Sequence, residues 1–559
     1  MIDLTIVIAG AAGQGIQTIG AILARTASEA GYAVFSWQEY ESRIRGGSNS
    51  YRIRVSDTPV NAPRARADIF IALDSSSKAK YRPLLKPEGI IVDEQETGDY
   101  AITVPFVRIA EEEFGNKLFA NTVAAGALAA ALRLELDSLS AVIAAEFAGK
   151  GEEIIAKNQA AAAAGYQRAK RECECVCPWE LTKREQQEQR QYLIGGNEAL
   201  ALGAAAAGCR FIAAYPMTPS TGIITFLAKH KEQLQIFTEQ AEDEIAAINL
   251  AIGASYAGVR AMTATSGGGF ALMVEGISLA GMTETPVVIV LGQRPAPATG
   301  LPTRTEQADL LFAINAGHGE FPKLVLAPAD PKDAFYKIVR AFNLAEKYQT
   351  PAIVLSDQFL ADSYFTITNF ALDALKNSSY RADPAQLREY KRYELTDTGR
   401  SPLLIPGESA HLVCCDSDEH DEAGHITEDL QLRNRMVEKR LTKWALLKQE
   451  IMPPEGYLLA EADRILLSWG SSRNAVFEAV DRLREHDMRV GALHFTELWP
   501  LPAFSFPNAD SFCTVESNAT AQLARLLKSE YGVTVQERIL RYDGLPLDAD
   551  YIMEAVRQW

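Results

Sequence analysis

The sequence predicts an α/β protein built from several doubly wound domains with parallel sheets. The apolar runs at residues 4–9 and 286–291 have the length and composition of buried parallel strands. The first run is followed by a glycine-rich loop and then by a segment with helical apolar spacing at residues 16–30. A chain of 559 residues, of which 47% are apolar, is long enough for about three or four such domains.

Charge and hydropathy exclude two classes of partner. The formal net charge of −17 argues against nucleic acid and against an anionic membrane, since both require basic patches. No run of about 18 uncharged apolar residues occurs, and the first residues enter a strand without a charged leader. We therefore expect a soluble, cytoplasmic protein.

The first domain is expected to comprise residues 1–172. Its first strand ends in Gly10-Ala-Ala-Gly-Gln-Gly15, and the helix at residues 16–30 follows directly. Backbone N–H groups at the start of such a helix face whatever lies above the loop, so this pattern predicts a nucleotide or phosphate site. The spacing is not Gly-x-Gly-x-x-Gly, and no acidic residue clearly ends a second strand, so a nicotinamide site is weakly supported.

An arginine-rich segment follows in the first domain. Four arginines surround the pair Gly46-Gly47, and they either hold phosphates or form the solvent face of two strands. They are Arg43, Arg45, Arg52 and Arg54.

Residues 173–191 are expected to be a linker that contains three cysteines, Cys173, Cys175 and Cys177. These cysteines lack the Cys-x2-Cys spacing and the fourth ligand of a metal site. We therefore expect them to be reduced and unliganded.

The second domain, at residues 192–370, contains the acid on which the functional prediction depends. A helix is expected from residue 241 onward, with Glu242, Asp243 and Glu244 in its first turn, where the helix dipole favours acids. Glu244 precedes the apolar run at 245–248, so it stands at the edge of the buried face. An apolar wall raises the pKa of a carboxyl group and lets it share a proton with a ligand nitrogen. An ordinary capping acid is the alternative.

Four loops accompany Glu244, and in an open parallel sheet such loops line one crevice. They read Tyr215-Pro-Met-Thr-Pro219, Thr263-Ala-Thr-Ser-Gly-Gly-Gly269, Gly292-Gln-Arg-Pro295 and Gly300-Leu-Pro-Thr303. This set resembles the pyrimidine-binding half of the 2-oxoacid:ferredoxin oxidoreductases, which are thiamine diphosphate enzymes. The signature turn of that family reads Tyr-Pro-Ile-Thr-Pro, and Met217 replaces its isoleucine here.

The resemblance implies roles for individual residues. Glu244 would hydrogen-bond the aminopyrimidine ring of thiamine diphosphate and favour the imino tautomer, which removes the thiazolium C2 proton. Thr218 and Arg294 would hold the carboxylate of the 2-oxoacid, with Thr303 in the same wall. A surface salt bridge is the alternative for Arg294. The other coenzyme-binding positions would be Tyr215, Pro216, Thr265, Ser266 and Gly267.

The first domain resembles the gamma part of the same family, which covers coenzyme A in relatives. By this likeness the chain is a fused gamma-alpha subunit, and the glycine loop approaches the coenzyme A pyrophosphate. The implied residues are Gly13, Gln14, Gly15 and Arg45.

Two further segments complete the chain. Residues 371–455 are expected to be an irregular connection that ends in a helix at 428–450, and its His420-Asp-Glu-Ala-Gly-His425 segment is interpreted as a polar loop rather than a metal site. Relatives carry a similar pattern followed by the equivalents of Met436, Lys439 and Arg440, to which no role is assigned. Residues 456–559 resemble a transketolase C-terminal-like domain.

The chain lacks parts that the resemblance requires. No Gly-Asp-Gly sequence occurs to bind the diphosphate through Mg²⁺, and no cysteine set suits a cluster, so no metal site is assigned to this chain. A separate beta subunit is therefore expected to supply Mg²⁺, the diphosphate contacts and a [4Fe-4S] cluster, in a dimer of alpha-beta heterodimers that reduces ferredoxin. This chain alone is expected to be inactive.

The favoured substrate is 2-oxoglutarate, because Gly300-Leu-Pro-Thr-Arg-Thr-Glu-Gln307 resembles that branch of the family and Arg304 could meet the distal carboxylate. Pyruvate and branched-chain 2-oxoacids are the alternatives. A non-catalytic scaffold subunit and a nucleotide-binding oxidoreductase that uses the first domain remain as hypotheses from other classes.

Overall fold

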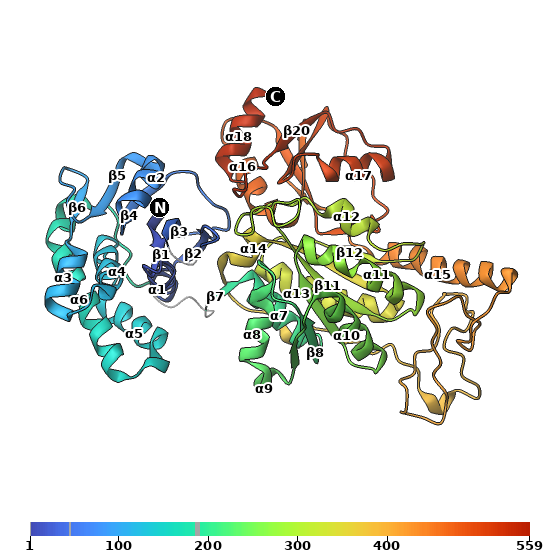
Figure 1. The fold of residues 1–559 in the computed structure, drawn as a ribbon. Helices are drawn as coiled ribbons and strands as arrows, with labels where there is room; N and C mark the ends of the chain where they lie inside the picture. Colours follow the sequence, from blue (N-terminus) through green and yellow to red (C-terminus); the bar gives the residue numbers. More distant parts are fainter. Residues whose placement is uncertain (1, 44–45, 185–190) are drawn as a thin grey trace. The chain divides into compact units, whose positions relative to one another are not determined.

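The structure is a computed structural model that describes residues 2–43, 46–184 and 191–559 (Figure 1). Arg45, one of the predicted coenzyme A residues, lies outside the described residues. The chain forms two compact units. Unit 1 contains Met1–Ile194, Asp362–Phe370 and Asp548–Tyr551, and unit 2 contains Gly195–Ala361, Ala371–Leu547 and Ile552–Trp559. In the described part of the chain, no helix is long and apolar enough to cross a bilayer.

Unit 1 is organised around an eight-stranded mixed sheet with the strand order β6-β5-β4-β1-β3-β2-β14-β7. The half formed by β1, β4, β5 and β6 is parallel, whereas β3 runs antiparallel to both β1 and β2. The strands are β1 (Asp3–Ala12), β2 (Ala33–Glu39), β3 (Gly46–Ser56), β4 (Ala67–Ala72), β5 (Leu85–Asp93), β6 (Ala101–Thr103), β7 (Tyr192–Gly195) and β14 (Tyr364–Ile367). Residues 362–370 thus group with the first unit, although the sequence places them in the second domain.

Two of the four arginines of the glycine-pair segment lie in β3 and have partners within the sheet. Arg54 is buried and donates to both carboxylate oxygens of Asp3, each at 2.8 Å. Arg52 pairs with Glu39 and lies over the ring of Trp37. These contacts tie the strands together, so for Arg52 and Arg54 the structure favours neither a phosphate site nor a solvent face.

The helices of unit 1 pack closely because glycines meet backbone at the crossing of α4 and α6. A Cβ atom on Gly126 would overlap with the carbonyl group of Ala162, and one on Gly165 would overlap with that of Val123. α6 continues to Val176, past the expected boundary at 172, and Cys173 and Cys177 are buried in the first core. The helices are α1 (Ile16–Glu29), α2 (Ser75–Tyr81), α3 (Phe106–Phe114), α4 (Ala120–Ala131), α5 (Leu136–Glu146) and α6 (Glu152–Val176).

Unit 2 contains a seven-stranded sheet with the order β18-β12-β13-β11-β10-β8-β9, parallel except for β18. α10 packs beside α11, and α7 packs beside α13. The strands are β8 (Phe211–Ala214), β9 (Phe237–Gln240), β10 (Ala261–Thr265), β11 (Val287–Gln293), β12 (Leu324–Leu326), β13 (Pro351–Asp357) and β18 (Glu497–Trp499). The helices are α7 (Gly196–Ala206), α8 (Thr221–Lys229), α9 (Lys231–Leu234), α10 (Glu244–Tyr256), α11 (Gly267–Met282), α12 (Leu310–Asn315), α13 (Pro331–Tyr348) and α14 (Gln358–Asp362).

A five-stranded sheet with the order β15-β17-β16-β19-β20 completes unit 2 and shares one apolar core with the larger sheet. The expected helix at 428–450 is α15 (Leu430–Glu450), which Asp429 caps. The other elements are β15 (Glu455–Tyr457), β16 (Arg464–Trp469), β17 (Val490–Phe495), β19 (Ser511–Glu516), β20 (Glu537–Leu540), α16 (Arg473–Arg484), α17 (Gln522–Tyr531) and α18 (Ala549–Gln558). The predicted α/β class with parallel-rich sheets is confirmed.

Candidate active site

The polar loops of unit 2 follow adjacent strands of the parallel sheet, as the sequence predicts. The Tyr215–Pro219 turn follows β8, the start of α11 follows β10, and Arg294 follows β11. Since β8, β10 and β11 are neighbours that run in the same direction, their carboxyl ends share one edge of the sheet. The candidate site is therefore this edge of the sheet, where open parallel sheets have their binding crevice.

Glu244 is the first residue of α10, and its carboxyl group is buried. The N-cap is Asp243, whose Oδ1 accepts a hydrogen bond of 2.7 Å from the backbone N–H of Ala246. The expected first turn is thus corrected, because Glu242 and Asp243 precede the helix. Asp243 carries out the capping, which leaves the Glu244 carboxyl group, on a residue only 4% exposed, available for another partner.

One carboxylate oxygen of Glu244 has no hydrogen-bond partner among the described residues. This atom, Oε1, is buried, and so is the equally unpartnered hydroxyl of Ser266 at the start of α11. Unsatisfied buried polar atoms are costly in a folded protein, and they are found where a ligand completes the bonding. The start of α10 and the start of α11 therefore offer polar atoms to a bound molecule.

Glycine at position 269 makes room for the Glu244 side chain. A Cβ atom on Gly269 would overlap with the hydroxyl of Thr265 and with Oε1 of Glu244, and it would lie 2.7 Å from the Glu244 carboxyl carbon. A Cβ atom on Gly268, by contrast, would have nothing within 4 Å. The first turn of α11 is thus packed against Glu244 on one side and open on another.

Arg294 is a buried cation without an anionic partner in the described chain. It is 9% exposed, and its Nη1 donates a hydrogen bond of 2.6 Å to the backbone carbonyl of Thr218. Burial lowers its pKa, and no described carboxylate forms an ion pair with it. A surface salt bridge, the alternative for this residue, is therefore wrong, and the contact brings Arg294 and Thr218 together as predicted.

Asp309 directly precedes α12 in the chain, and its side chain lies near Gly267, the first residue of α11. The sequence did not identify Asp309 as a site residue. Its Oδ2 is 2.8 Å from the position of a Cβ atom on Gly267, and its backbone N–H donates to Oε1 of Gln293 at 3.0 Å. Burial raises the pKa of Asp309 to about 6. An aspartate just before a short helix looks like an ordinary N-cap in sequence, yet this side chain makes no capping hydrogen bond.

The remaining predicted residues of unit 2 lie on the loops around this crevice. Thr303 and Arg304 are half-buried, and the side chain of Arg304 packs against Gly544, where a Cβ atom would be 3.0 Å away. Tyr215 is 40% exposed and Pro216 is half-buried. Their roles stay predictions.

In unit 1 the glycine loop after β1 borders a cleft of about 630 Å³, within the range of ligand pockets. Gly13 lines the cleft, and a Cβ atom there would have nothing within 4 Å. Gln14 fixes the loop, because its amide accepts from Ala11 N at 2.7 Å and donates to the Leu73 carbonyl at 3.2 Å. Lys78, Lys117, Asp74 and Asp93 are among the other lining residues.

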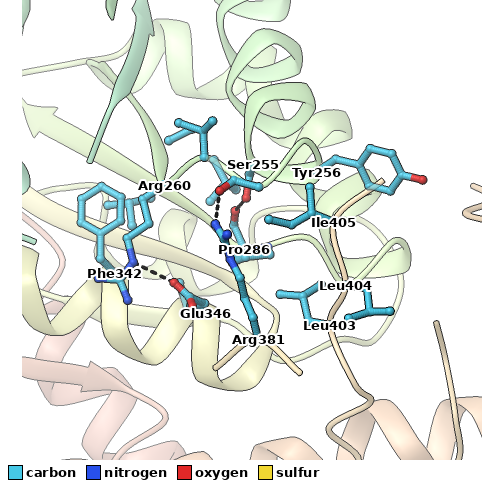
Figure 2. Close-up of a pocket in the computed structure, with 16 residues that line it drawn as sticks. Ser255, Tyr256, Arg260, Pro286, Phe342, Glu346, Arg381, Leu403, Leu404 and Ile405 are labelled. Atoms are coloured by element: carbon cyan, nitrogen blue, oxygen red, sulfur yellow. Dashed lines mark hydrogen bonds and ion pairs between the residues drawn. The ribbon is translucent and has the colours of Figure 1, made fainter. Parts of the chain in front are cut away.

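A small cavity at the opposite end of α10 is too small to be the coenzyme site. Figure 2 shows it between the end of α10, the start of β11 and the segment at residues 403–405. Arg260 pairs with Glu346 there at 2.7 Å, and Arg381 donates to the Gly258 carbonyl. Its volume of about 40 Å³ is far below that of coenzyme sites.

Two family models match this chain. Residues 5–168 match the model described as pyruvate ferredoxin/flavodoxin oxidoreductase, and residues 202–439 match its thiamine diphosphate-binding counterpart. The alpha subunit of a 2-oxoacid:ferredoxin oxidoreductase from Sulfolobus sp is 34% identical over 616 aligned residues, which cover 99% of this chain and 96% of that protein. The chain belongs to the 2-oxoacid:ferredoxin oxidoreductase family.

Other members of the 2-oxoacid:ferredoxin oxidoreductase family are similar over different lengths. The 2-oxoglutarate synthase subunit KorA of Methanothermobacter thermautotrophicus is 36% identical over 56% of this chain and 82% of its own length. A solved structure of 2-oxoglutarate:ferredoxin oxidoreductase from Magnetococcus marinus, with 2-oxoglutarate, coenzyme A and succinyl-CoA bound, matches with a TM-score of 0.92 and 33% identity. It covers 100% of this chain and 99% of that one.

The predicted family and the fused gamma-alpha organisation are therefore confirmed. The gamma-type model spans the cleft of unit 1, and the thiamine diphosphate-binding model spans Glu244, Arg294 and Asp309. The geometry of this oxidoreductase subunit suits the coenzyme, because the buried Oε1 of Glu244 lacks the partner that a pyrimidine nitrogen would provide.

Proposed function

We propose that the chain is the fused gamma-alpha subunit of a 2-oxoglutarate:ferredoxin oxidoreductase. This enzyme would convert 2-oxoglutarate and coenzyme A reversibly to succinyl-CoA and CO2 and pass the electrons to ferredoxin. The observation that carries the proposal is the buried, unpartnered carboxylate oxygen of Glu244 beside Gly269. A second observation supports an anionic substrate: Arg294 is buried and has no counter-ion in the described part of the chain.

In this proposal Glu244 holds the aminopyrimidine ring of thiamine diphosphate through a shared proton. When bound there, the coenzyme would supply the nucleophilic carbon and the electron sink that decarboxylation of a 2-oxoacid requires. Arg294 binds the carboxylate of the 2-oxoacid, because a guanidinium group can donate to both of its oxygens. Thr218 and Thr303 complete that wall. The residues that would line the coenzyme are Tyr215, Pro216, Thr265, Ser266 and Gly267.

The proposal requires a partner subunit. A beta subunit would hold the diphosphate through Mg²⁺ and carry the [4Fe-4S] cluster that receives the electrons, and relatives are named as subunit alpha of such enzymes. Coenzyme A would lie across the cleft of unit 1, with its pyrophosphate near Gly13, Gln14 and Gly15. The complex would act in the cytoplasm as a dimer of alpha-beta heterodimers.

The substrate assignment draws on similarity and on one side chain. The Magnetococcus marinus structure and the KorA relative are both named for 2-oxoglutarate. Arg304 lies one residue beyond Thr303, where a second cation would suit a distal carboxylate. Pyruvate or a branched-chain 2-oxoacid is the alternative.

The test uses the complex purified with its beta subunit. We expect reduction of a low-potential acceptor that depends on coenzyme A and is fastest with 2-oxoglutarate in a panel of 2-oxoacids. Glu244→Gln should abolish turnover with assembly intact, whereas the control Glu242→Gln, at an exposed position just before α10, should retain it. Unchanged turnover in Glu244→Gln would instead identify a scaffold subunit with a partner-borne active site.

A further inference from the structure

Asp309 is a buried carboxyl group that no described residue hydrogen-bonds. It is 9% exposed, and it forms no ion pair and no side-chain hydrogen bond within the described chain. Its oxygens are not among the fully enclosed unpartnered atoms, so the carboxyl group keeps an accessible side from which it can hydrogen-bond a ligand.

The segment that carries Asp309 is held in place by the C-terminal part of unit 2. The backbone N–H of Gln307 donates to the Ser517 carbonyl at 2.6 Å, and Asn518 donates to the Gln307 carbonyl at 3.1 Å. On the other side, Gln522 donates to the Ala308 carbonyl at 2.6 Å. These bonds fix the backbone around Asp309.

Asp309 contacts both the end of β11 and the start of α11. Its backbone is bonded to Gln293, the residue directly before the substrate-side Arg294, and its carboxyl group touches the start of α11 at Gly267. Glu244 packs against the same helical turn at Gly269. The first turn of α11 therefore separates the carboxyl groups of Asp309 and Glu244, and Asp309 is bonded to the residue that precedes Arg294 in the chain.

We infer that Asp309 is a further substrate-binding residue, whose protonated carboxyl group donates a hydrogen bond to the keto oxygen of the 2-oxoacid. This inference rests on the proposed function. A 2-oxoacid held by its carboxylate on Arg294 presents the keto oxygen beside that anchor, and this oxygen can only accept hydrogen bonds. An ionised carboxylate there would repel the anionic substrate, whereas a neutral carboxyl group polarises the ketone for attack.

The ionisable groups around Asp309 influence its protonation state. Glu306, on the same loop, has its pKa raised to about 7 by burial and by the charge of Asp309. Glu244 at the start of α10 and Arg294 after β11 are buried ionisable groups on the neighbouring elements. No cation pairs with Asp309 among the described residues, so burial raises its pKa to about 6.

The inference is tested by ligand binding to the coenzyme-loaded complex with its beta subunit. The probe is N-oxalylglycine, which keeps both carboxylates and the C2 carbonyl of 2-oxoglutarate without being decarboxylated, or oxamate if pyruvate proves to be the substrate. We expect the wild-type Kd to rise between pH 6 and pH 8, by up to about 10-fold per pH unit, because the carboxyl group must be protonated. Asp309→Asn should remove this dependence, and Asp309→Ala should weaken binding about 10-fold at pH 6.

Matched variants separate this role from others. Glu306→Gln should keep the pH dependence, and Asp330→Asn, which changes an aspartate that caps α13, should leave binding unchanged. The inference is overturned if Asp309→Asn retains the wild-type pH profile, if Glu306→Gln loses it instead, or if the Asp309 variants weaken thiamine diphosphate binding but not the probe. If Asp309→Ala does not fold, the isosteric Asn variant decides. Failure of the proposed function would show differently, as a wild-type complex that turns over no 2-oxoacid.

Discussion

The Glu244 carboxylate occupies the space that a side chain at Gly269 would need. The acid from α10 and the glycine of α11 are thus a complementary pair, since the small residue permits the buried acid to reach the crevice. This pairing explains why a glycine run begins α11 although glycine is unfavourable inside helices. The neighbouring Gly268 faces open space, so a methyl group should be tolerated there and not at Gly269.

Gly269→Ala should destabilise the chain and weaken coenzyme binding. The added methyl group would overlap with Thr265 and Glu244, and overpacking of this kind costs about 1–3 kcal/mol. Gly268→Ala is the matched control for stability, because its methyl group meets nothing within 4 Å. Denaturant unfolding and thiamine diphosphate titration of both variants give the comparison, and equal losses of stability at the two positions would contradict the packing described here.

Arg294→Met should leave the fold stable while removing substrate affinity. Among the described residues the buried guanidinium group has no counter-ion, so an apolar replacement removes a desolvation cost, but it also removes the hydrogen bond to the Thr218 carbonyl. We expect these two effects to offset, leaving the unfolding free energy within about 1 kcal/mol of the wild type, with KM for the 2-oxoacid raised at least 10-fold. Arg294→Lys keeps the charge but loses the planar guanidinium group, so its KM should lie between those of the wild type and of Arg294→Met. A loss of more than about 2 kcal/mol of stability in Arg294→Met would show a structural role instead.

Arg304→Ala should discriminate between 2-oxoacids. If Arg304 contacts the distal carboxylate, kcat/KM should fall about 10- to 100-fold for 2-oxoglutarate and change little for pyruvate, which has no distal carboxylate. The two substrates are compared in the same preparation, so any loss from altered packing against Gly544 affects both. Equal losses on the two substrates would end the distal role.

The sequence predicted the architecture well because the strands and helices of this chain have clear apolar periods. The helix expected at residues 16–30 is α1, and the strand expected at residues 286–291 is β11. The antiparallel path of β3 was not predicted, because strand direction depends on which strands pair, and the local sequence of residues 46–56 does not specify its partners β1 and β2. Likewise, β14 pairs with β2 across more than 300 residues of sequence, which no local pattern indicates.

The sequence predicted only those site residues that occur in a recognisable family motif. Glu244, Thr218 and Arg294 were found through the family likeness, and the structure shows which of three consecutive acids is buried. Asp309 was missed because its sequence context is that of a helix cap, and only the tertiary contact with Gly267 shows that it serves another purpose. Its pKa depends on burial, which a linear pattern does not encode.

The segment of unassigned role around Lys439 and Arg440 forms a buried ionic cluster in the structure. Glu284 at the end of α11 is fully buried and accepts hydrogen bonds from Lys439 at 2.6 Å and from Lys443 at 2.7 Å. Arg392 donates to the backbone carbonyl of Glu284 at 2.7 Å. Arg440 pairs with Glu419, beside His420. α15 is thus fastened to the far end of the helix whose first turn borders Glu244.

Glu284→Gln should destabilise the chain by about 3–5 kcal/mol at neutral pH, because it leaves two buried ammonium groups without their carboxylate. In the wild type, the cations hold the pKa of Glu284 below its ordinary value of 4.5, so its contribution to stability is present above that pH and is lost as the pH falls further. Burial lowers the pKa of Lys439 to about 8, so unfolding, which returns it to 10.5, takes up a proton between these values. Stability from this group therefore rises with pH between about 8 and 10.5.

The Glu284→Gln variant should consequently regain part of its stability at high pH. Without the carboxylate, Lys439 and Lys443 lose the attraction that favours their charged forms, so their pKa values fall further. The increase of the unfolding free energy with pH therefore begins at a lower pH in the variant than in the wild type. Denaturant unfolding at pH 7 and pH 9.5 measures the effect, and the deficit of the variant relative to wild type should be smaller at pH 9.5. Glu419→Gln is the control, since its arginine partners stay charged at both pH values and its deficit should not change. A Glu284→Gln deficit that is independent of pH would mean that the lysines are neutral already or find other partners.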